Sequence, residues 1–181
     1  LGTSFGGIIA IHAAQLFPQY VRGVLLLSPF LATAYDSILS VACAEIAAPG
    51  VLSHLPGGGV ATLALAHLRF ISNGASVASS RPEERFWYLE NPLRTVCLGR
   101  AMGQEVQAAL ANYTTPTLLV TSDADEIVDS PSVRRMFSGL RSVENVAYSA
   151  SEGVHHQVSP RNLRIHPRWD SMRDEILRFI D

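Results

Sequence analysis

The order of apolar and polar residues predicts alternating helices and strands at both ends of the chain. After a glycine-rich turn at residues 2–7, the mostly apolar stretch Ile8–Phe17 predicts a helix buried against a sheet and ended by Pro18. Val21–Pro29 contains an uninterrupted apolar run, which is typical of a buried parallel strand. The beginning of the chain therefore predicts a turn, a helix and a strand.

The alternation returns towards the end of the chain. Thr117–Thr121 and Val143–Ser149 predict two further strands, and Ser130–Leu140 predicts a helix between them with Ser130 as its N-cap. Arg168–Phe179 carries its apolar residues on one face, which predicts an amphipathic helix. Strands that alternate with helices indicate a mostly parallel sheet with helices on its faces.

The region between these ends predicts no strand. It contains three helical runs, at Ser37–Ala48, Val60–Ile71 and about Leu93–Ala111. We therefore expect a core made of residues 1–30 and 113–181, with residues 31–112 as a mainly helical insertion that forms a lid.

Composition excludes several classes of protein. The 181 residues are 48% hydrophobic and carry a net charge of −2, and the scattered arginines do not form the basic face that a nucleic-acid groove needs. No apolar run is long enough to span a bilayer. Cys43 and Cys97 each lie in an apolar stretch, so we interpret them as small buried hydrophobic residues rather than as a disulfide.

The chain starts at Leu1 without a signal-peptide pattern, so we expect it to begin inside a larger protein. The strand at Val21–Ser28 is then expected to lose its inner neighbour and become an edge, and the isolated chain to be inactive. Localisation stays open, with a cytoplasmic protein favoured.

The residues Gly2-Thr3-Ser4-Phe5-Gly6 fit the pattern G-x-S-x-G. In this pattern a serine sits in a strained turn from a strand into a helix, and the small residues on either side let neighbouring segments approach. The Ser4 hydroxyl can then act as a nucleophile, and the Phe5 backbone N–H can donate an oxyanion-hole hydrogen bond. The alternative is a phosphate-binding helix start, but no G-x-x-x-x-G-K-[ST] motif supports it.

Two polar turns after later strands supply candidates for a general base and its partner. Asp123 and Asp125 follow the strand at 117–121, where an aspartate can orient a histidine and stabilise its imidazolium form. His155 and His156 follow the strand at 143–149. The remaining histidines are interpreted as packed or solvated side chains, namely His12, His54, His67 and His166.

With serine, aspartate and histidine in this order, the chain resembles the α/β-hydrolase superfamily, and most of all its monoacylglycerol-lipase-like and serine-aminopeptidase-like branch. The resemblance rests on GTSFGG, VRGVLLLSPF, TPTLLVTSDADEIVD and SEGVHHQ, and it does not reach into residues 31–112. It implies the C-terminal part of an α/β-hydrolase fold, a parallel sheet flanked by helices, with a variable lid.

The resemblance also implies roles for single residues. Ser4 matches the nucleophile, and Asp125 matches the acid better than Asp123 does. One departure is Ser122, which stands where the family usually has glycine. His156 matches the base, and a shorter register would select His155 instead.

The function that the resemblance implies is a serine hydrolase that cleaves a carboxylic ester through a Ser-His-Asp triad and an acyl-enzyme. The apolar, weakly charged region 31–112 favours a lipophilic or medium-chain acyl group in a small-molecule ester, with no metal and no cofactor. The alternatives are an acyltransferase or peptidase on the same triad, and a non-catalytic binding module on the same fold. The oligomeric state stays open.

Overall fold

The computed structural model describes residues 1–33, 35–48, 70–72, 90–149, 152 and 168–181. The chain divides into two compact units: the first comprises residues 1–34 and 100–181, and the second comprises residues 35–99. Each unit is described by itself. The predicted division at 31–112 therefore differs at both ends from the units observed.

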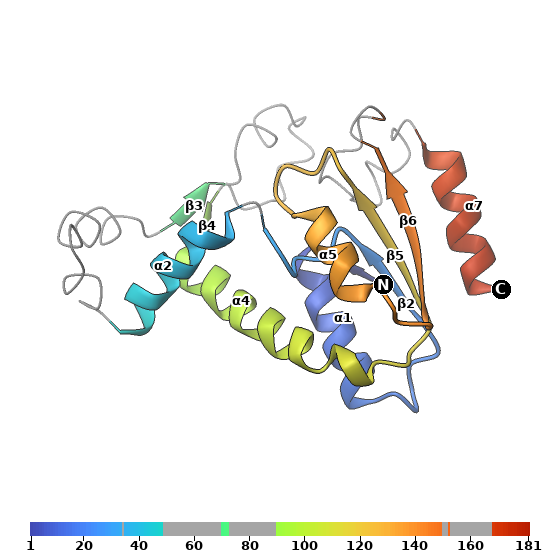
Figure 1. Ribbon diagram of the computed structural model, residues 1–181, viewed down its shortest axis with the longest axis horizontal. Helices are drawn as coiled ribbons and strands as arrows, with labels where there is room; N and C mark the ends of the chain where they lie inside the picture. The colour runs from blue at the N-terminus through green and yellow to red at the C-terminus, as the bar shows by residue number, and fades with distance from the viewer. Residues whose placement is uncertain (34, 49–69, 73–89, 150–151, 153–167) are drawn as a thin grey trace. The chain divides into compact units, whose positions relative to one another are not determined.

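A four-stranded parallel sheet forms the centre of the first unit (Figure 1). Its strands, in spatial order, are β1 (Gly2–Thr3), β2 (Val24–Leu27), β5 (Thr117–Ser122) and β6 (Val143–Tyr148). This confirms the three strands predicted within residues 21–29, 117–121 and 143–149. The expectation that the strand at Val21–Ser28 would be an edge is wrong, because Gly2 and Thr3 pair with Leu26 and Leu27. Two residues of the glycine-rich turn are enough to add a short fourth strand.

Helices cover both faces of this sheet, which is the predicted arrangement. α1 (Phe5–Leu16) contacts β1 and β2, and α5 (Ser130–Phe137) contacts β5, whereas α7 (Trp169–Ile180) lies on the opposite face (Figure 1). Side chains alternate between the two faces of a strand, so each strand contributes to both cores. The core under α7 consists of Leu25, Leu27, Leu118, Val120, Tyr148 and Met172.

The predicted apolar face of the last helix agrees with this packing. Met172 of α7 is fully buried, and Trp169, Ile176 and Phe179 pack beside it against the sheet. The helix predicted at Leu93–Ala111 is observed as α4 (Leu93–Ala108) followed by a 3₁₀ turn, η3 (Leu110–Asn112). Among the described helices, none has both the length and the apolar character that crossing a bilayer requires.

The second unit contains α2 (Asp36–Ala47), the beginning of α4 and two short strands. The strands are β3 (Phe70–Ser72) and β4 (Glu90–Pro92), which pair antiparallel. The expectation that residues 31–112 contain no strand is therefore wrong. The helix predicted at Val60–Ile71 lies mostly outside the described residues, and its last two residues belong to β3. The pairing joins residues far apart in sequence, which local apolar spacing does not reveal.

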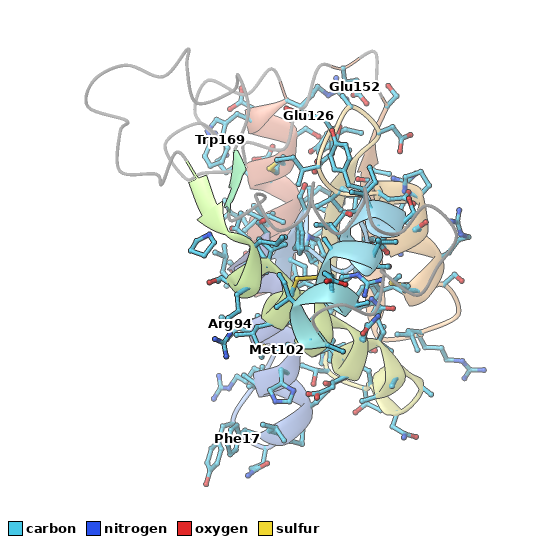
Figure 2. All side chains as sticks on the ribbon, turned by 90° about the vertical axis from the view of Figure 1, so that its left-hand side faces the viewer. Phe17, Arg94, Met102, Glu126, Glu152 and Trp169 are labelled. Carbon is cyan, nitrogen blue, oxygen red and sulfur yellow. A yellow bond between two sulfur atoms is a disulfide. The ribbon has the colours of Figure 1, made fainter. Side chains whose placement is uncertain are left out.

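A disulfide joins Cys43 of α2 to Cys97 of α4 within the second unit, with the two Cα atoms 5.3 Å apart (Figure 2). The interpretation of both cysteines as unpaired hydrophobic residues is therefore wrong. The two residues are 54 positions apart. A pairing of this kind depends on how two helices pack, and the spacing of two cysteines in sequence says nothing about that.

Candidate active site

Ser4 occupies the sharp turn between β1 and α1, and its backbone is strained. It has φ 50° and ψ −120°, a region that residues with a side chain rarely adopt. The Ser4 amide donates to the carbonyl oxygen of Leu27 at 3.0 Å. The Ser4 carbonyl accepts from the amides of Gly7 at 2.9 Å and Phe30 at 3.0 Å. Backbone hydrogen bonds from three directions therefore hold the strained turn in place.

Two glycines around Ser4 allow the close approach of neighbouring backbone. A Cβ at Gly2 would lie 2.5 Å from the carbonyl oxygen of Gly6, and a Cβ at Gly7 would lie 2.6 Å from the Cβ of Pro29. A Cβ at Gly6 would meet no described atom within 4 Å. The expected requirement for a residue without a side chain therefore holds for Gly2 but is wrong for Gly6. The same requirement applies to Gly7 instead. The motif pattern did not include Gly7.

Phe5 is the first residue of α1, so its backbone N–H has no acceptor within the helix. Its ring stacks on the ring of Phe30, with the centroids 4.4 Å apart and the planes at 25°. Phe30 is buried in the segment that follows β2. This stacking, together with the hydrogen bond from Phe30 to Ser4, fixes the start of α1 against that segment.

Asp125 follows β5 in a turn that fixes its carboxylate. Its Oδ1 atom accepts from the amides of Ile127 at 2.9 Å and Val128 at 2.8 Å. Ser122, the departure from the family pattern, accepts from the amide of Ala124 at 3.2 Å through its hydroxyl oxygen. The serine thus supports the same turn with a local side-chain hydrogen bond.

Asp123 has different surroundings from Asp125. It is exposed, and it forms an ion pair with Arg134 of α5 at 2.7 Å. The same guanidinium donates to the Thr121 hydroxyl at 3.1 Å. Asp125 is partly buried and lies in the turn beyond this ion pair. The geometry therefore favours Asp125 over Asp123 as the orienting acid.

The buried segment after β2, residues 28–33, connects the serine turn to the aspartate turn. Phe30 contacts Ser4 as described above. Thr33 forms an isolated antiparallel bridge with Val128, and the amide of Asp129 donates to the carbonyl of Ala32 at 3.0 Å. The two turns are thus held by one piece of backbone. Sequence reasoning did not identify this segment, although its run of small and apolar residues is visible.

Asp129, and not Ser130, caps α5. Its Oδ1 atom accepts from the Ser132 amide at 3.1 Å, and its other carboxylate oxygen accepts from the Ser132 hydroxyl. These hydrogen bonds, the hydroxyl bond above all, hold the pKa of Asp129 below its usual range. The predicted N-cap was therefore one residue late. The side chain of Ser130 is buried instead.

Because the strands are parallel, Ser4 and Asp125 both lie at the carboxyl ends of the strands, on the same side of the sheet. Ser4 follows β1 and Asp125 follows β5, and β2 lies between these strands. Neighbouring strands are just under 5 Å apart, so the two strand ends are separated by roughly 10 Å, a gap that an imidazole can bridge. His155 and His156 follow β6 in the sequence and lie outside the described residues, as do His54, His67 and His166. His12 is partly buried on α1.

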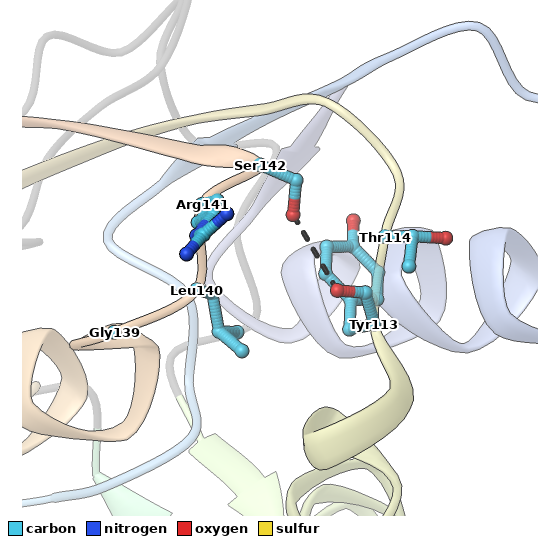
Figure 3. A pocket seen from close by; sticks show the side chains of 6 residues that line it. All are labelled: Tyr113, Thr114, Gly139, Leu140, Arg141 and Ser142. Carbon is cyan, nitrogen blue, oxygen red and sulfur yellow. Dashed lines mark hydrogen bonds between the residues drawn. The ribbon is translucent and has the colours of Figure 1, made fainter.

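No group of three or more His, Cys, Asp or Glu side chains in the described part of the chain is placed to hold a metal ion. An open pocket of about 430 Å³ lies where the chain enters β5 and β6 (Figure 3). Ser4 follows β1 and therefore lies at the other end of these parallel strands. The residues that line the pocket are Tyr113, Thr114, Gly139, Leu140, Arg141 and Ser142.

Comparison with known proteins gives one family match and several matches in fold. The family model described as serine aminopeptidase, S33, matches residues 1–159. None of the curated proteins matches the sequence significantly.

Several solved structures have a similar fold. A monoacylglycerol lipase of Paleococcus ferrophilus is 15% identical with a TM-score of 0.65, and the alignment covers 98% of this chain and 65% of that protein. A monoglyceride lipase of Saccharomyces cerevisiae is 16% identical with a TM-score of 0.62, covering 99% and 60%. A carboxyl esterase of Bacillus coagulans is 15% identical with a TM-score of 0.56, covering 99% and 62%. This similarity establishes the α/β-hydrolase fold, and the chain spans 60–65% of the length of these three proteins.

Proposed function

Because this chain belongs to the serine aminopeptidase S33 family, we propose that it is a serine hydrolase in which Ser4 attacks a carboxylic ester. The observation that carries the proposal is the backbone of Ser4. It has a positive φ at a strand-to-helix turn, and three backbone hydrogen bonds hold it there. Strained conformations of this kind persist where the surrounding structure enforces them, and they cluster at active sites. The turn presents the serine at the edge where parallel α/β sheets bind ligands.

The proposed reaction is acyl transfer in two steps. His156, with His155 as the alternative, takes the proton of the Ser4 hydroxyl while the serine oxygen attacks the ester carbonyl. The protonated histidine then gives this proton to the leaving alcohol. Water hydrolyses the acyl-enzyme with the same histidine as base. Asp125 holds the imidazole in the required tautomer and stabilises its charged form.

The Phe5 backbone N–H is the proposed oxyanion-hole donor. It is the first amide of α1, and the stacking of Phe5 on Phe30 fixes the residue that carries it. A helix N-terminus adds a favourable dipole for negative charge. One such donor is worth about a hundred- to a thousand-fold in kcat.

The proposed substrate is a small ester with a lipophilic or medium-chain acyl group. Two features support this choice: the apolar composition of residues 31–112, and the presence of two monoacylglycerol lipases and an esterase among the similar structures. The expected inactivity of the 181 residues alone stays a prediction.

A peptidase is the second candidate, because the matching family model is described as a serine aminopeptidase. The same triad and acyl-enzyme would then cleave an amide. The discriminating measurement is kcat/KM on nitrophenyl esters of increasing acyl length against amino-acid nitroanilides. A preference for the nitroanilides would replace the ester proposal.

The first test is labelling by a fluorophosphonate probe, which reacts with activated serines. We expect the wild type to be labelled at Ser4 and the variant Ser4→Ala to be neither labelled nor active, with an unchanged circular dichroism spectrum. A folded wild-type protein that the probe does not label would support the non-catalytic binding module instead.

A further inference from the structure

Charged and polar side chains hold the two ends of the segment that carries His155 and His156. Glu152 precedes residues 153–167 and Arg168 follows them. The Arg168 Nε atom lies 3.1 Å from the Glu152 carboxylate oxygen Oε1. An ion pair therefore joins the two residues that flank the histidine segment, although 16 positions separate them in sequence.

The second carboxylate oxygen of Glu152 is also bound. Its Oε2 atom accepts from the backbone amide of Ser149 at 2.7 Å and from the Ser149 hydroxyl at 3.1 Å. The Glu152 amide in turn donates to the Ser149 carbonyl at 3.0 Å. Both oxygens of one carboxylate are thus engaged, one with the end of β6 and the other with the start of α7.

Both anchors of this carboxylate are attached to the core. Ser149 follows Tyr148, which is 4% exposed at the end of β6. The Arg168 carbonyl accepts from the amide of Met172, which is 1% exposed and packs in the same core as Tyr148. Glu152 and Arg168 flank the segment between them, and both are attached to β6 and α7, which are fixed in the core.

A second ion pair joins the same two elements and provides a comparison. Arg178 of α7 lies 2.6 Å from Glu144 of β6, with both side chains more than half exposed. The Glu152 side chain is only 27% exposed. Exposed ion pairs add little to stability. The two pairs are alike in chemistry, although Arg178 also binds Glu175 at 2.7 Å, and only Glu152 and Arg168 flank the histidines.

We propose that Glu152 and Arg168 are positioning residues, which hold the histidine segment so that its catalytic histidine reaches Ser4. This inference rests on the proposed function. A general base acts only within hydrogen-bond reach of the proton that it takes, and a displacement of about 1 Å costs up to about a hundred-fold in rate. The ion pair keeps the segment ends at one fixed separation and so limits such displacement.

The test compares two matched pairs of variants in the complete gene product. Glu152→Gln, Arg168→Gln and the double variant remove the proposed clamp, and Arg168→Lys keeps its charge. Glu144→Gln and Arg178→Gln are the controls. The readouts are kcat and KM on a nitrophenyl ester, the rate of fluorophosphonate labelling at Ser4, and the melting temperature.

We expect each clamp variant to lower kcat and the labelling rate about ten- to a hundred-fold with little change in KM or melting temperature. The double variant should be no worse than the single ones, because both remove one interaction. Arg168→Lys should recover part of the loss, and the controls should behave as wild type.

The outcomes separate this inference from the proposed function. If the wild-type protein is not labelled at Ser4, both the proposed function and the positioning role are wrong. Normal labelling together with unchanged kcat in Glu152→Gln and Arg168→Gln removes the positioning role alone. A loss of kcat that parallels a large fall in melting temperature, or an equal loss in the controls, assigns the pair to stability and also overturns the inference.

Discussion

The Arg134 guanidinium binds the Asp123 carboxylate at 2.7 Å and so ties that carboxylate to α5 at the protein surface. Two residues later, Asp125 accepts two backbone hydrogen bonds through one oxygen and lies partly buried. Two acids that are almost adjacent in sequence therefore have different surroundings. One has a cation as its partner, and the other has a turn that orients it.

This difference predicts unequal effects of neutralising the two acids. Asp125→Asn should lower kcat on the order of 10⁴-fold, because an amide no longer stabilises the imidazolium form. Asp123→Asn removes only an exposed ion pair, so it should leave kcat unchanged and cost less than about 1 kcal/mol of stability. Steady-state kinetics of both variants check this. Equal losses of kcat, or a larger loss in Asp123→Asn, would reverse the assignment of the acid.

The strained backbone of Ser4 predicts that two inactive variants at this position differ in stability. Glycine accepts φ 50° and ψ −120° without strain, whereas alanine does not. Ser4→Gly should therefore be more stable than Ser4→Ala by about 1 kcal/mol, with both variants inactive. Urea unfolding of the two variants measures the difference. Equal stability would show that the turn is not strained in solution.

The glycines beside Ser4 predict a contrast between two alanine substitutions. A Cβ at Gly7 would lie 2.6 Å from the Pro29 Cβ and 2.9 Å from its Cα, so Gly7→Ala should destabilise the fold by about 1–3 kcal/mol through overpacking. Gly6→Ala meets open space in a helix, and it should be neutral or stabilise the fold by up to about 1 kcal/mol. Thermal unfolding distinguishes the two. A Gly6→Ala variant that is the more damaged of the two would contradict the structure.

The disulfide predicts that stability depends on redox conditions. It closes a loop of 54 positions between Cys43 and Cys97, and in the chain-entropy model a loop of this length stabilises by about 4 kcal/mol. The double variant Cys43→Ser/Cys97→Ser should lower the melting temperature, as should a reductant added to the wild type. The reductant should not affect the double variant, which serves as the control. Two free thiols titrated in the unreduced, unfolded wild type would show that the bond does not form.

The cap of α5 predicts a pH-dependent contribution to stability. The pKa of Asp129 in the folded protein is lowered, chiefly by its hydrogen bond with Ser132. The ionised carboxylate therefore contributes fully to the stability of the folded protein above about pH 4. This contribution is lost as the pH falls through the lowered pKa. Asp129→Ala should cost about 1 kcal/mol at pH 7, and the gap to wild type should narrow below pH 4. Urea unfolding at pH 7 and pH 3 gives the comparison, and a gap independent of pH would exclude the charged cap.

Several features were predictable because local sequence is sufficient to specify them. The strand Val24–Leu27 is an uninterrupted apolar run, and Leu118–Val120 forms a shorter one within β5, as is typical of strands buried on both faces. The amphipathic α7 follows from a period that places Met172 inward. The turn at Ser4 was predicted from a glycine pattern, in which Gly2 has the expected steric role.

Other features needed contacts that sequence neighbours do not report. The N-cap of α5 moved from Ser130 to Asp129 because the bridge between Thr33 and Val128 and the bond from Asp129 to Ala32 set where the helix begins. Both residues are good caps, so local propensity did not decide between them. Likewise, the strands β3 and β4 are short, and each forms only by pairing with the other.

The sequence by itself thus determined the order of β2, β5, α5, β6 and α7, the position of Ser4 in its turn and the two candidate acids, because each depends on a few adjacent residues. The tertiary structure alone decided that Cys43 forms a disulfide with Cys97 and that Gly7, rather than Gly6, must lack a side chain. It also decided that Arg134 forms its ion pair with Asp123 and not with Asp125. The physical reason is common to these three cases. Each depends on the distance between atoms whose residues are remote in sequence, and folding sets that distance.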